Sequence, residues 1–323
     1  MSRFRLLITD RAWPDTSIER DVLAPLDVEI VEPAGTDEAS LIAAAANVDA
    51  IATNWAQVTG AVIAAAPNCR IVARLGIGVD NIAIPAATQR QIPVTNCPDY
   101  CVTEVADHAL GLLLALARRI AFFHYRTKQG EYRLQSASGL RRLSCQTLGL
   151  FGLGRTGREL CQRARALGLR VIAHTSRGDN YGLNCDMVDF KTLLRESDYL
   201  SIHAPLTPAT RHQFNAAALG EMRETAFLIN TSRGGLIDHE ALWDAIRRGR
   251  LAGAALDVFD PEPPDLSLPL FQDERVIVTP HAAFVSEESL TDLRSRVMQQ
   301  VLAALRGERP ENVLNPQIYT ASS

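Results

Sequence analysis

A glycine-rich stretch between a strand and a helix constrains the fold of this chain more than any other feature. In LGLFGLGRTGRELCQRARALG, Gly152, Gly154 and Gly157 follow an apolar run and precede a helical one. This spacing permits a tight turn, the close approach of a pyrophosphate, and close packing of the helix on the strand. Because a second β-branched run follows at 170–174, we expect a dinucleotide at the N-terminus of this helix. The other residues of the predicted loop are Leu153, Arg155 and Thr156.

Short β-branched runs alternate with helical stretches along the rest of the chain. The strands expected in the first half cover residues 5–10, 27–31, 49–53, 70–75 and 92–96. Those expected in the second half cover residues 147–154, 170–174, 199–204, 226–231, 253–259 and 275–280. Such alternation is typical of parallel sheets covered by helices on both faces. The predicted fold class is therefore α/β, with two doubly wound parallel-sheet domains.

The division between the two domains follows from where the strand series is interrupted. A length of 323 residues suggests about two domains. A long apolar helix at 103–119, which opens at Thr103, separates the two series, and another helix is expected at 286–306. We predict that residues 1–98 and 286–323 form one domain and that residues 99–285 form the dinucleotide-binding domain.

Composition and charge exclude several classes of function. Apolar residues make up 47% and charged residues 22% of the chain, which is ordinary for a globular protein. The net charge is -4 and no long basic run occurs, so we expect no nucleic-acid partner. The longest apolar stretch, 109–117, is too short to span a bilayer, and the N-terminal apolar run is too short for a signal peptide. The six cysteines lack paired CxxC spacing, so we expect reduced thiols, no metal site and a cytoplasmic protein.

The letters TSRG occur twice, each time after an expected strand. At the first copy an NAD site usually carries Asp or Glu, which holds the ribose hydroxyls. This chain has Thr175, Ser176 and Arg177 there, and a hydroxyl and a guanidinium can hold a 2′-phosphate. We therefore expect NADP to be preferred, with NAD possible because Asp179 lies nearby. The alternative is that Arg177 is a solvated loop residue.

The second copy belongs to a group of charged residues at strand ends. Arg233 follows the expected strand 226–231, Glu262 follows 253–259, and His281 follows 275–280. Ligands of open α/β sheets bind beyond the carboxyl ends of the strands. A histidine paired with a carboxylate can donate a proton near neutral pH, and an arginine can hold a carboxylate and polarise a carbonyl. These three residues are the candidate catalytic set.

With these motifs in order, the chain resembles the D-isomer-specific 2-hydroxyacid dehydrogenases over nearly its whole length. The motifs that carry the resemblance are RLGIGVDNI (74–82), VADHALGLLLALAR (105–118), GLFGLGRTG (149–157), HAPLTPATRH (203–212), LINTSRGGLID (228–238), AALDVFDPEP (254–263) and VTPHAA (278–283). Within the family, PDYCVTEVADHA and HAAFVSEESL are most similar to the branch related to C-terminal-binding-protein corepressors.

The resemblance implies an NAD(P)-dependent oxidoreductase that transfers a hydride between the nicotinamide and a 2-oxo acid to give a D-2-hydroxy acid. Arg233 would hold the 2-oxo acid, and His281 would be the general acid–base. Glu262 would orient His281 and favour its protonated form.

The family also implies a role for each domain. Residues 1–98 with 286–323 would form a flavodoxin-like substrate domain, in which the amides near Ile77 and Gly78 bind the substrate carboxylate and Arg74 adds a second contact. Residues 99–285 would form a Rossmann domain for the cofactor. The further residues expected along its dinucleotide cleft are Thr103, His203, Pro205, Thr231 and Asp257, the last two beside the nicotinamide carboxamide.

One departure from the family and two further expectations complete the sequence-based prediction. The corepressor-related branch often has Trp three residues after the catalytic His, where this chain has Phe284, so the shape of the substrate pocket differs. A homodimer is expected, because the family pairs subunits through its cofactor domains and the helix at 103–119 is apolar on several faces. The alternative function is a nucleotide-sensing, corepressor-like binding protein with weak or no turnover.

Overall fold

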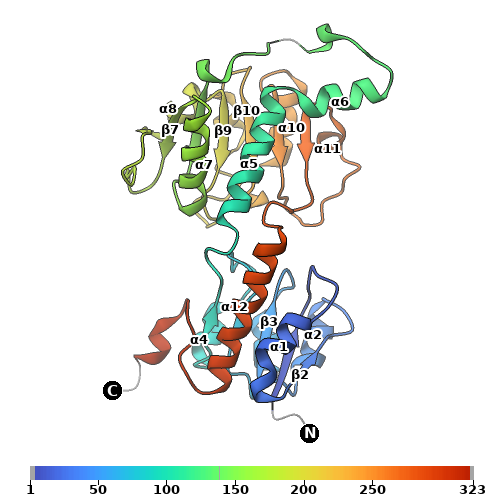
Figure 1. Ribbon diagram of the computed structural model, residues 1–323, viewed down its shortest axis with the longest axis vertical. Helices are drawn as coiled ribbons and strands as arrows, with labels where there is room; N and C mark the ends of the chain where they lie inside the picture. The colour runs from blue at the N-terminus through green and yellow to red at the C-terminus, as the bar shows by residue number, and fades with distance from the viewer. Residues whose placement is uncertain (1–3, 138, 321–323) are drawn as a thin grey trace. The chain divides into compact units, whose positions relative to one another are not determined.

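The computed structural model describes residues 4–137 and 139–320, and these form two compact units. Unit 1 comprises Met1–Tyr100 with Ser286–Ser323, and unit 2 comprises Cys101–Val285. Each unit is built on one parallel β-sheet with helices packed on it (Figure 1), which confirms the predicted fold class. None of the helices within the described ranges is long and apolar enough to span a membrane.

Unit 1 contains a five-stranded parallel sheet in the order β2-β1-β3-β4-β5. Its strands are β1 (Phe4–Ile8), β2 (Val28–Val31), β3 (Ala50–Thr53), β4 (Val72–Arg74) and β5 (Val94–Thr95). Its helices are α1 (Ser17–Leu23), α2 (Glu38–Ala45), α3 (Gly60–Ala64), α4 (Ile84–Gln89) and α12 (Glu287–Leu305). Helix α12 returns the chain to this unit and packs against α1. It begins at a capping box in which Ser286 and Ser289 bond each other's backbone.

Unit 2 contains a seven-stranded parallel sheet in the order β12-β11-β10-β9-β6-β7-β8. Its strands are β6 (Thr147–Phe151), β7 (Arg170–His174), β8 (Asp186–Met187), β9 (Tyr199–Ile202), β10 (Phe227–Asn230), β11 (Gly253–Leu256) and β12 (Val276–Val278). Its helices are α5 (Val102–Ala117), α6 (Ile120–Lys128), α7 (Arg155–Ala166), α8 (Phe190–Glu196), α9 (Ala216–Gly220), α10 (His239–Arg247) and α11 (Pro269–Gln272).

Successive residues of the central strands in unit 2 pack into different cores on the two faces of the sheet. Leu148 and Leu150 of β6 join the core beneath α5 and α7, whereas Phe151 joins the core beneath α8, α9 and α10. The same alternation occurs along β9, where Tyr199 faces the first core and Leu200 the second. Because side chains alternate along a strand and both faces are covered, these strands are apolar throughout.

The observed elements differ from the expected ones mainly at their ends. Helix α5 begins at Val102, so Thr103 lies in its first turn and does not cap it. The strand expected at 253–259 ends at Leu256. The amide of the next residue, Asp257, still donates to the Asn230 carbonyl of β10 at 3.0 Å, while its carboxylate bonds the loop after β12. Helix α6 and the segment after it extend away from the sheet of unit 2 (Figure 1).

Candidate functional site

The glycine loop between β6 and α7 has the geometry that a pyrophosphate needs. Gly152 has a φ of +100°, and a Cβ there would lie 2.7 Å from the carbonyl carbon of His203. A Cβ on Gly157 would lie 2.5 Å from the Gly152 oxygen, so the helix can pack on the turn only without a side chain. A Cβ on Gly154 would meet nothing within 4 Å. The loop is therefore tight on its protein side and open at Gly154, as a dinucleotide site requires.

The other loop residues lie where the sequence motif predicts, with different exposures. Arg155 is exposed at the first position of α7 and Thr156 is partly buried. The Leu153 side chain is buried in the core beneath α5 and α7, so only its backbone can face a ligand.

The end of β9 lies directly beneath the glycine loop. The amide of His203 donates to the Phe151 carbonyl at 2.7 Å, and its Nε2 lies 2.8 Å from the Ser201 hydroxyl. Burial lowers the pKa of His203 to about 4, so the ring is neutral at physiological pH. Pro205, two residues further, is exposed.

The end of β10 presents a buried polar atom that suits a bound amide. The hydroxyl of Thr231 is buried and has no hydrogen-bond partner among residues 4–137 and 139–320. Unpartnered buried hydroxyls are uncommon in folded proteins and are often explained by a missing ligand. Together with the open glycine loop, this atom fits a nicotinamide dinucleotide lying along the carboxyl ends of the strands.

After β7, at the position where NAD sites usually have Asp or Glu, the chain has Thr175, Ser176 and Arg177. The Thr175 hydroxyl accepts the Gly178 amide at 3.0 Å and closes a turn. Ser176 and Arg177 are exposed and have no hydrogen-bond or ion-pair partner in the described part of the chain. The carboxylate of Asp179 accepts the amide of Tyr181 at 2.7 Å.

The candidate catalytic residues lie in the loops after β10, β11 and β12. Nδ1 of His281 lies 2.8 Å from Oε2 of Glu262, and Oε1 of Glu262 accepts the amide of Phe259 at 2.8 Å. Burial alone would raise the pKa of Glu262. The hydrogen bond and charge of His281, the Phe259 amide and the charge of Arg233 together hold that pKa below its ordinary value. The carboxylate is thus ionised and fixes the imidazole through Nδ1.

The loop of Arg233 is packed tightly against the loop of Glu262. Nη1 of Arg233 donates to the Ser232 carbonyl at 2.7 Å. The next residue, Gly234, has the Phe259 backbone so close that a Cβ would lie 1.9 Å from the Phe259 carbonyl carbon. Only glycine therefore allows the two loops to approach in this way.

The backbone of His281 is held in a strained conformation by Asp257. His281 has a φ of +52°, and its amide donates to the Asp257 carbonyl at 2.8 Å. The fully buried Asp257 carboxylate accepts the amides of Ala282 at 2.9 Å and Ala283 at 3.0 Å. The Phe284 ring lies edge-on to His281, with centroids 6.0 Å apart. These described contacts assign Asp257 to the His281 turn, and its place beside a nicotinamide stays a prediction.

In unit 1, the loop after β4 turns its carbonyl groups toward the protein. Nε of the buried Arg74 donates to the Gly78 carbonyl at 2.8 Å, and Nδ2 of Asn96 donates to the Ile77 carbonyl at 2.7 Å. The amides of Ile77 and Gly78 have no acceptor in the described chain. The arrangement suits an anion, because successive unpaired amides attract negative charge. Arg74 contacts its own loop, and a contact between it and a substrate stays a prediction.

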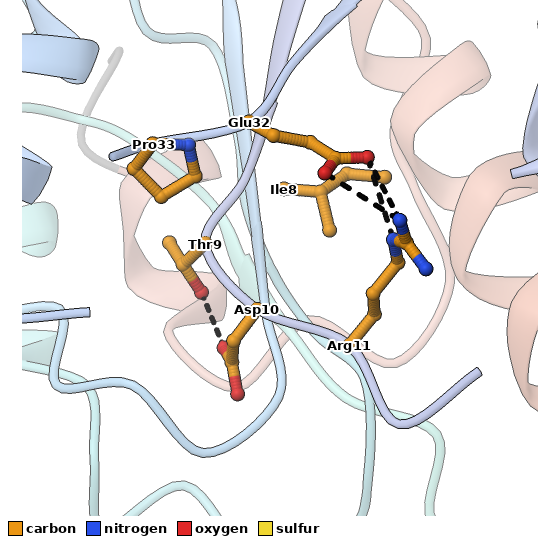
Figure 2. A pocket seen from close by; sticks show the side chains of 6 residues that line it. All are labelled: Ile8, Thr9, Asp10, Arg11, Glu32 and Pro33. Atoms are coloured by element: carbon orange, nitrogen blue, oxygen red, sulfur yellow. Dashed lines mark hydrogen bonds and ion pairs between the residues drawn. The ribbon is translucent and has the colours of Figure 1, made fainter. Parts of the chain in front are cut away.

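A small cavity in unit 1 lies apart from these residues. It opens at the carboxyl ends of β1 and β2, where Arg11 pairs with Glu32 across the cavity and Asp10 bonds Thr9 (Figure 2). The Asp10 carboxylate also accepts the amides that follow β3, including that of Trp55 at 2.7 Å. This cavity contains none of the predicted site residues, and its charged groups are already paired.

The sequence-based prediction gave no role to three residues of unit 2 that contact the candidate site: Gly234, Thr279 and His108. Gly234 and Thr279 lie inside quoted motifs, but nothing local shows that they contact Phe259 and His108. The sequence around His108 gives no sign of a partner for its side chain. In the structure its Nε2 lies 3.0 Å from the hydroxyl of Thr279, 171 residues away. Long-range contacts of this kind leave no trace in local sequence patterns.

Similarity to known proteins agrees with this geometry. The model of the NAD-binding domain of the D-isomer specific 2-hydroxyacid dehydrogenases matches residues 110–283. A glyoxylate reductase from Korarchaeum cryptofilum is 38% identical over 263 residues, which cover 80% of this chain and 79% of the relative. A crystal structure of an NADPH-dependent glyoxylate/hydroxypyruvate reductase from Sinorhizobium meliloti, in complex with NADP and malonate, superposes with a TM-score of 0.85. Its sequence is 31% identical, with 97% of each chain covered.

Some relatives are longer than this chain. A D-3-phosphoglycerate dehydrogenase from Methanocaldococcus jannaschii is 38% identical over 267 residues, which are 80% of this chain and 50% of the relative. The chain thus spans about half the length of that relative and about four fifths of the glyoxylate reductase. The motifs, the two parallel sheets and these matches agree, and the chain belongs to the D-isomer specific 2-hydroxyacid dehydrogenases, a family of nicotinamide-dependent oxidoreductases.

Proposed function

We propose that this chain catalyses the reversible reduction of a 2-oxo acid to a D-2-hydroxy acid. The observation that carries the proposal is the 2.8 Å pair of His281 and Glu262, which lies in the same unit as the open glycine loop. The reductases that the chain resembles, named for glyoxylate and hydroxypyruvate, support this class of substrate.

Arg233, Glu262 and His281 have different roles in the proposed reaction. Glu262 holds Nδ1 of His281, so Nε2 is the ring nitrogen that exchanges a proton with the substrate oxygen. Arg233 binds the 2-oxo acid and stabilises the charge that develops on its carbonyl oxygen. When bound, the reduced nicotinamide supplies the hydride to C2 of the substrate. Phe284, beside His281, lines the pocket for the rest of the substrate.

We assign the substrate carboxylate to unit 1 and the cofactor to unit 2. The unpaired amides of Ile77 and Gly78 bind the carboxylate, and the buried Arg74 fixes the loop that presents them. In unit 2 the glycine loop binds the pyrophosphate, the Thr231 hydroxyl the nicotinamide carboxamide, and Thr103 and Pro205 line the cleft.

We propose NADP as the preferred cofactor. Support comes from the exposed Ser176 and Arg177 at the position where an acid would select NAD. A doubly charged 2′-phosphate would find a hydroxyl donor and a cation there, with no ion pair to break.

We also propose a cytoplasmic homodimer that pairs through unit 2. The segment from α6 onward exposes large apolar side chains: Tyr125 is 58% exposed, Tyr132 93% and Leu134 83%. Exposed apolar residues that lie close together in one segment commonly mark protein–protein contacts. All six cysteines are free thiols, which suits a reducing compartment.

The decisive experiment measures oxidation of NADPH and NADH with glyoxylate, hydroxypyruvate and pyruvate, followed by the chirality of the product. We expect turnover, a D-product where a chiral centre forms, and loss of at least ~10²-fold in kcat for His281→Ala with nucleotide binding retained. Binding of NADPH without turnover of any 2-oxo acid would contradict the proposal and favour a nucleotide sensor. Near-normal kcat in His281→Ala would contradict the assigned acid–base.

A further inference from the structure

A chain of hydrogen bonds links helix α5 to the turn that carries His281. Nε2 of His108 lies 3.0 Å from Oγ1 of Thr279 and 3.6 Å from Oδ1 of Asp257. The Thr279 hydroxyl donates to the same Oδ1 of Asp257. Asp257 in turn accepts the amides of Ala282 and Ala283. Three segments of unit 2, helix α5 and the loops after β11 and β12, therefore meet at one buried carboxylate.

The direction of each hydrogen bond follows from the chemistry of the groups. A hydroxyl has one proton, and Thr279 gives it to the carboxylate of Asp257. The oxygen of Thr279 must then accept from His108, so Nε2 of His108 carries a proton. The His108 side chain is 25% exposed and reaches this buried network from helix α5, which packs on β10 and β11.

The network stabilises the backbone of His281, which has an unfavourable conformation. A histidine with φ near +52° costs free energy and persists only where its surroundings fix it. Asp257 fixes three successive amides, that of His281 through its carbonyl and the next two through its carboxylate. Thr279 and His108 limit how that carboxylate can turn, because they are its remaining polar contacts among the described residues.

We propose that Thr279 and His108 are positioning residues for the acid–base, acting on His281 through Asp257. This inference rests on the proposed role of His281. Loss of the hydroxyl lets the Asp257 carboxylate rotate, the turn relaxes, and His281 loses its alignment with Glu262.

The test compares Thr279→Val, which keeps the shape and removes the hydroxyl, with Thr279→Ser, which keeps the hydroxyl. With NADPH and glyoxylate, we expect Thr279→Val to lower kcat by about tenfold to a hundredfold, the scale of a misplacement of about 1 Å or less. The KM for NADPH stays within threefold of wild type, and Thr279→Ser recovers most of kcat. A wild-type kcat in Thr279→Val, or an equal loss in Thr279→Ser, overturns the inference.

A second pair keeps the test decisive if Thr279→Val does not fold. His108→Leu removes the donor, whereas His108→Gln retains a side-chain N–H, and the same criteria apply to this pair. His124→Leu on the exposed side of α6 is the matched control and should leave kcat unchanged. His281→Ala in the same assay separates the two hypotheses. If it retains turnover, the proposed function fails, and if it alone loses turnover, only the positioning role fails.

Discussion

A single methyl group at Gly234 should disable the acid–base pair and leave the cofactor loop intact. The Cβ of Gly234→Ala would lie 1.9 Å from the carbonyl carbon of Phe259 and 2.1 Å from its oxygen. Nine in ten Cβ contacts are longer than 3.4 Å, so the Phe259 backbone must retreat by about 1.5 Å, the difference between 3.4 and 1.9 Å. The atoms in the way are backbone, so no side-chain rotation relieves the clash.

The displaced peptide is the one that orients Glu262. The Phe259 amide donates to Oε1 of Glu262 at 2.8 Å, and a retreat of this size breaks that bond or drags the carboxylate with it. Misplacing a catalytic group by about 1 Å costs roughly 10²-fold in rate, or about 2.7 kcal/mol at 1.36 kcal/mol per factor of ten. We therefore expect kcat/KM for the 2-oxo acid to fall by about 10²-fold in Gly234→Ala.

The assay combines steady-state kinetics with a fluorescence titration of NADPH and a thermal melt. The Kd for NADPH should change little, because the glycine loop follows β6, which β9 separates from β10 in the sheet. Gly220→Ala at the end of α9 is the matched control, since a Cβ there meets nothing within 4 Å. The reasoning is refuted if folded Gly234→Ala keeps kcat/KM within threefold of wild type, or if NADPH binding weakens as much as turnover.

Three further outcomes are expected. Arg177→Ala should weaken the binding of NADPH by about ten- to a hundredfold and that of NADH hardly at all, as measured by isothermal titration. The reason is that one charge-assisted contact contributes roughly 1.5–3 kcal/mol to binding. Equal weakening of both cofactors would show that Arg177 is only a solvated loop residue. The folded-state pKa of His203, about 4, lies below its unfolded value near 6.5, so the unfolded chain binds more protons between these values and stability is lost as pH falls through that window. The His203 side chain is partly exposed, so the effect is smaller than for a fully buried ring. In urea denaturation, we expect the free energy of unfolding to fall by about 2 kcal/mol more in wild type than in His203→Asn between pH 7 and pH 4. An identical pH dependence in both proteins would count against this assignment. Tyr132→Asp combined with Leu134→Asp should convert a dimer to a monomer in light scattering, and a wild-type protein that is monomeric at micromolar concentration would remove the proposed interface.

The sequence by itself determined the fold class and predicted the main site residues. A strand, three glycines and a helix have few structural solutions, so Gly152, Gly154 and Gly157 predicted the dinucleotide loop before any contact was known. The strand alternation likewise predicted two parallel sheets, because a strand buried on both faces is apolar throughout. Strand ends were placed up to three residues too late, as at 253–259, since apolar residues continue past the last ladder bond.

Only the tertiary structure decided how the loops at the carboxyl ends of the strands are held together. Asp257 lies in the motif AALDVFDPEP, yet only the structure shows that its carboxylate bonds the turn of His281. Gly234 must be a glycine because the Phe259 backbone packs on it. The bond between His108 and Thr279 joins residues 171 positions apart. Local sequence patterns report periodicity and turn chemistry within a few residues, whereas these contacts depend on which strands become neighbours in the sheet, and that arrangement is fixed only when the whole core packs.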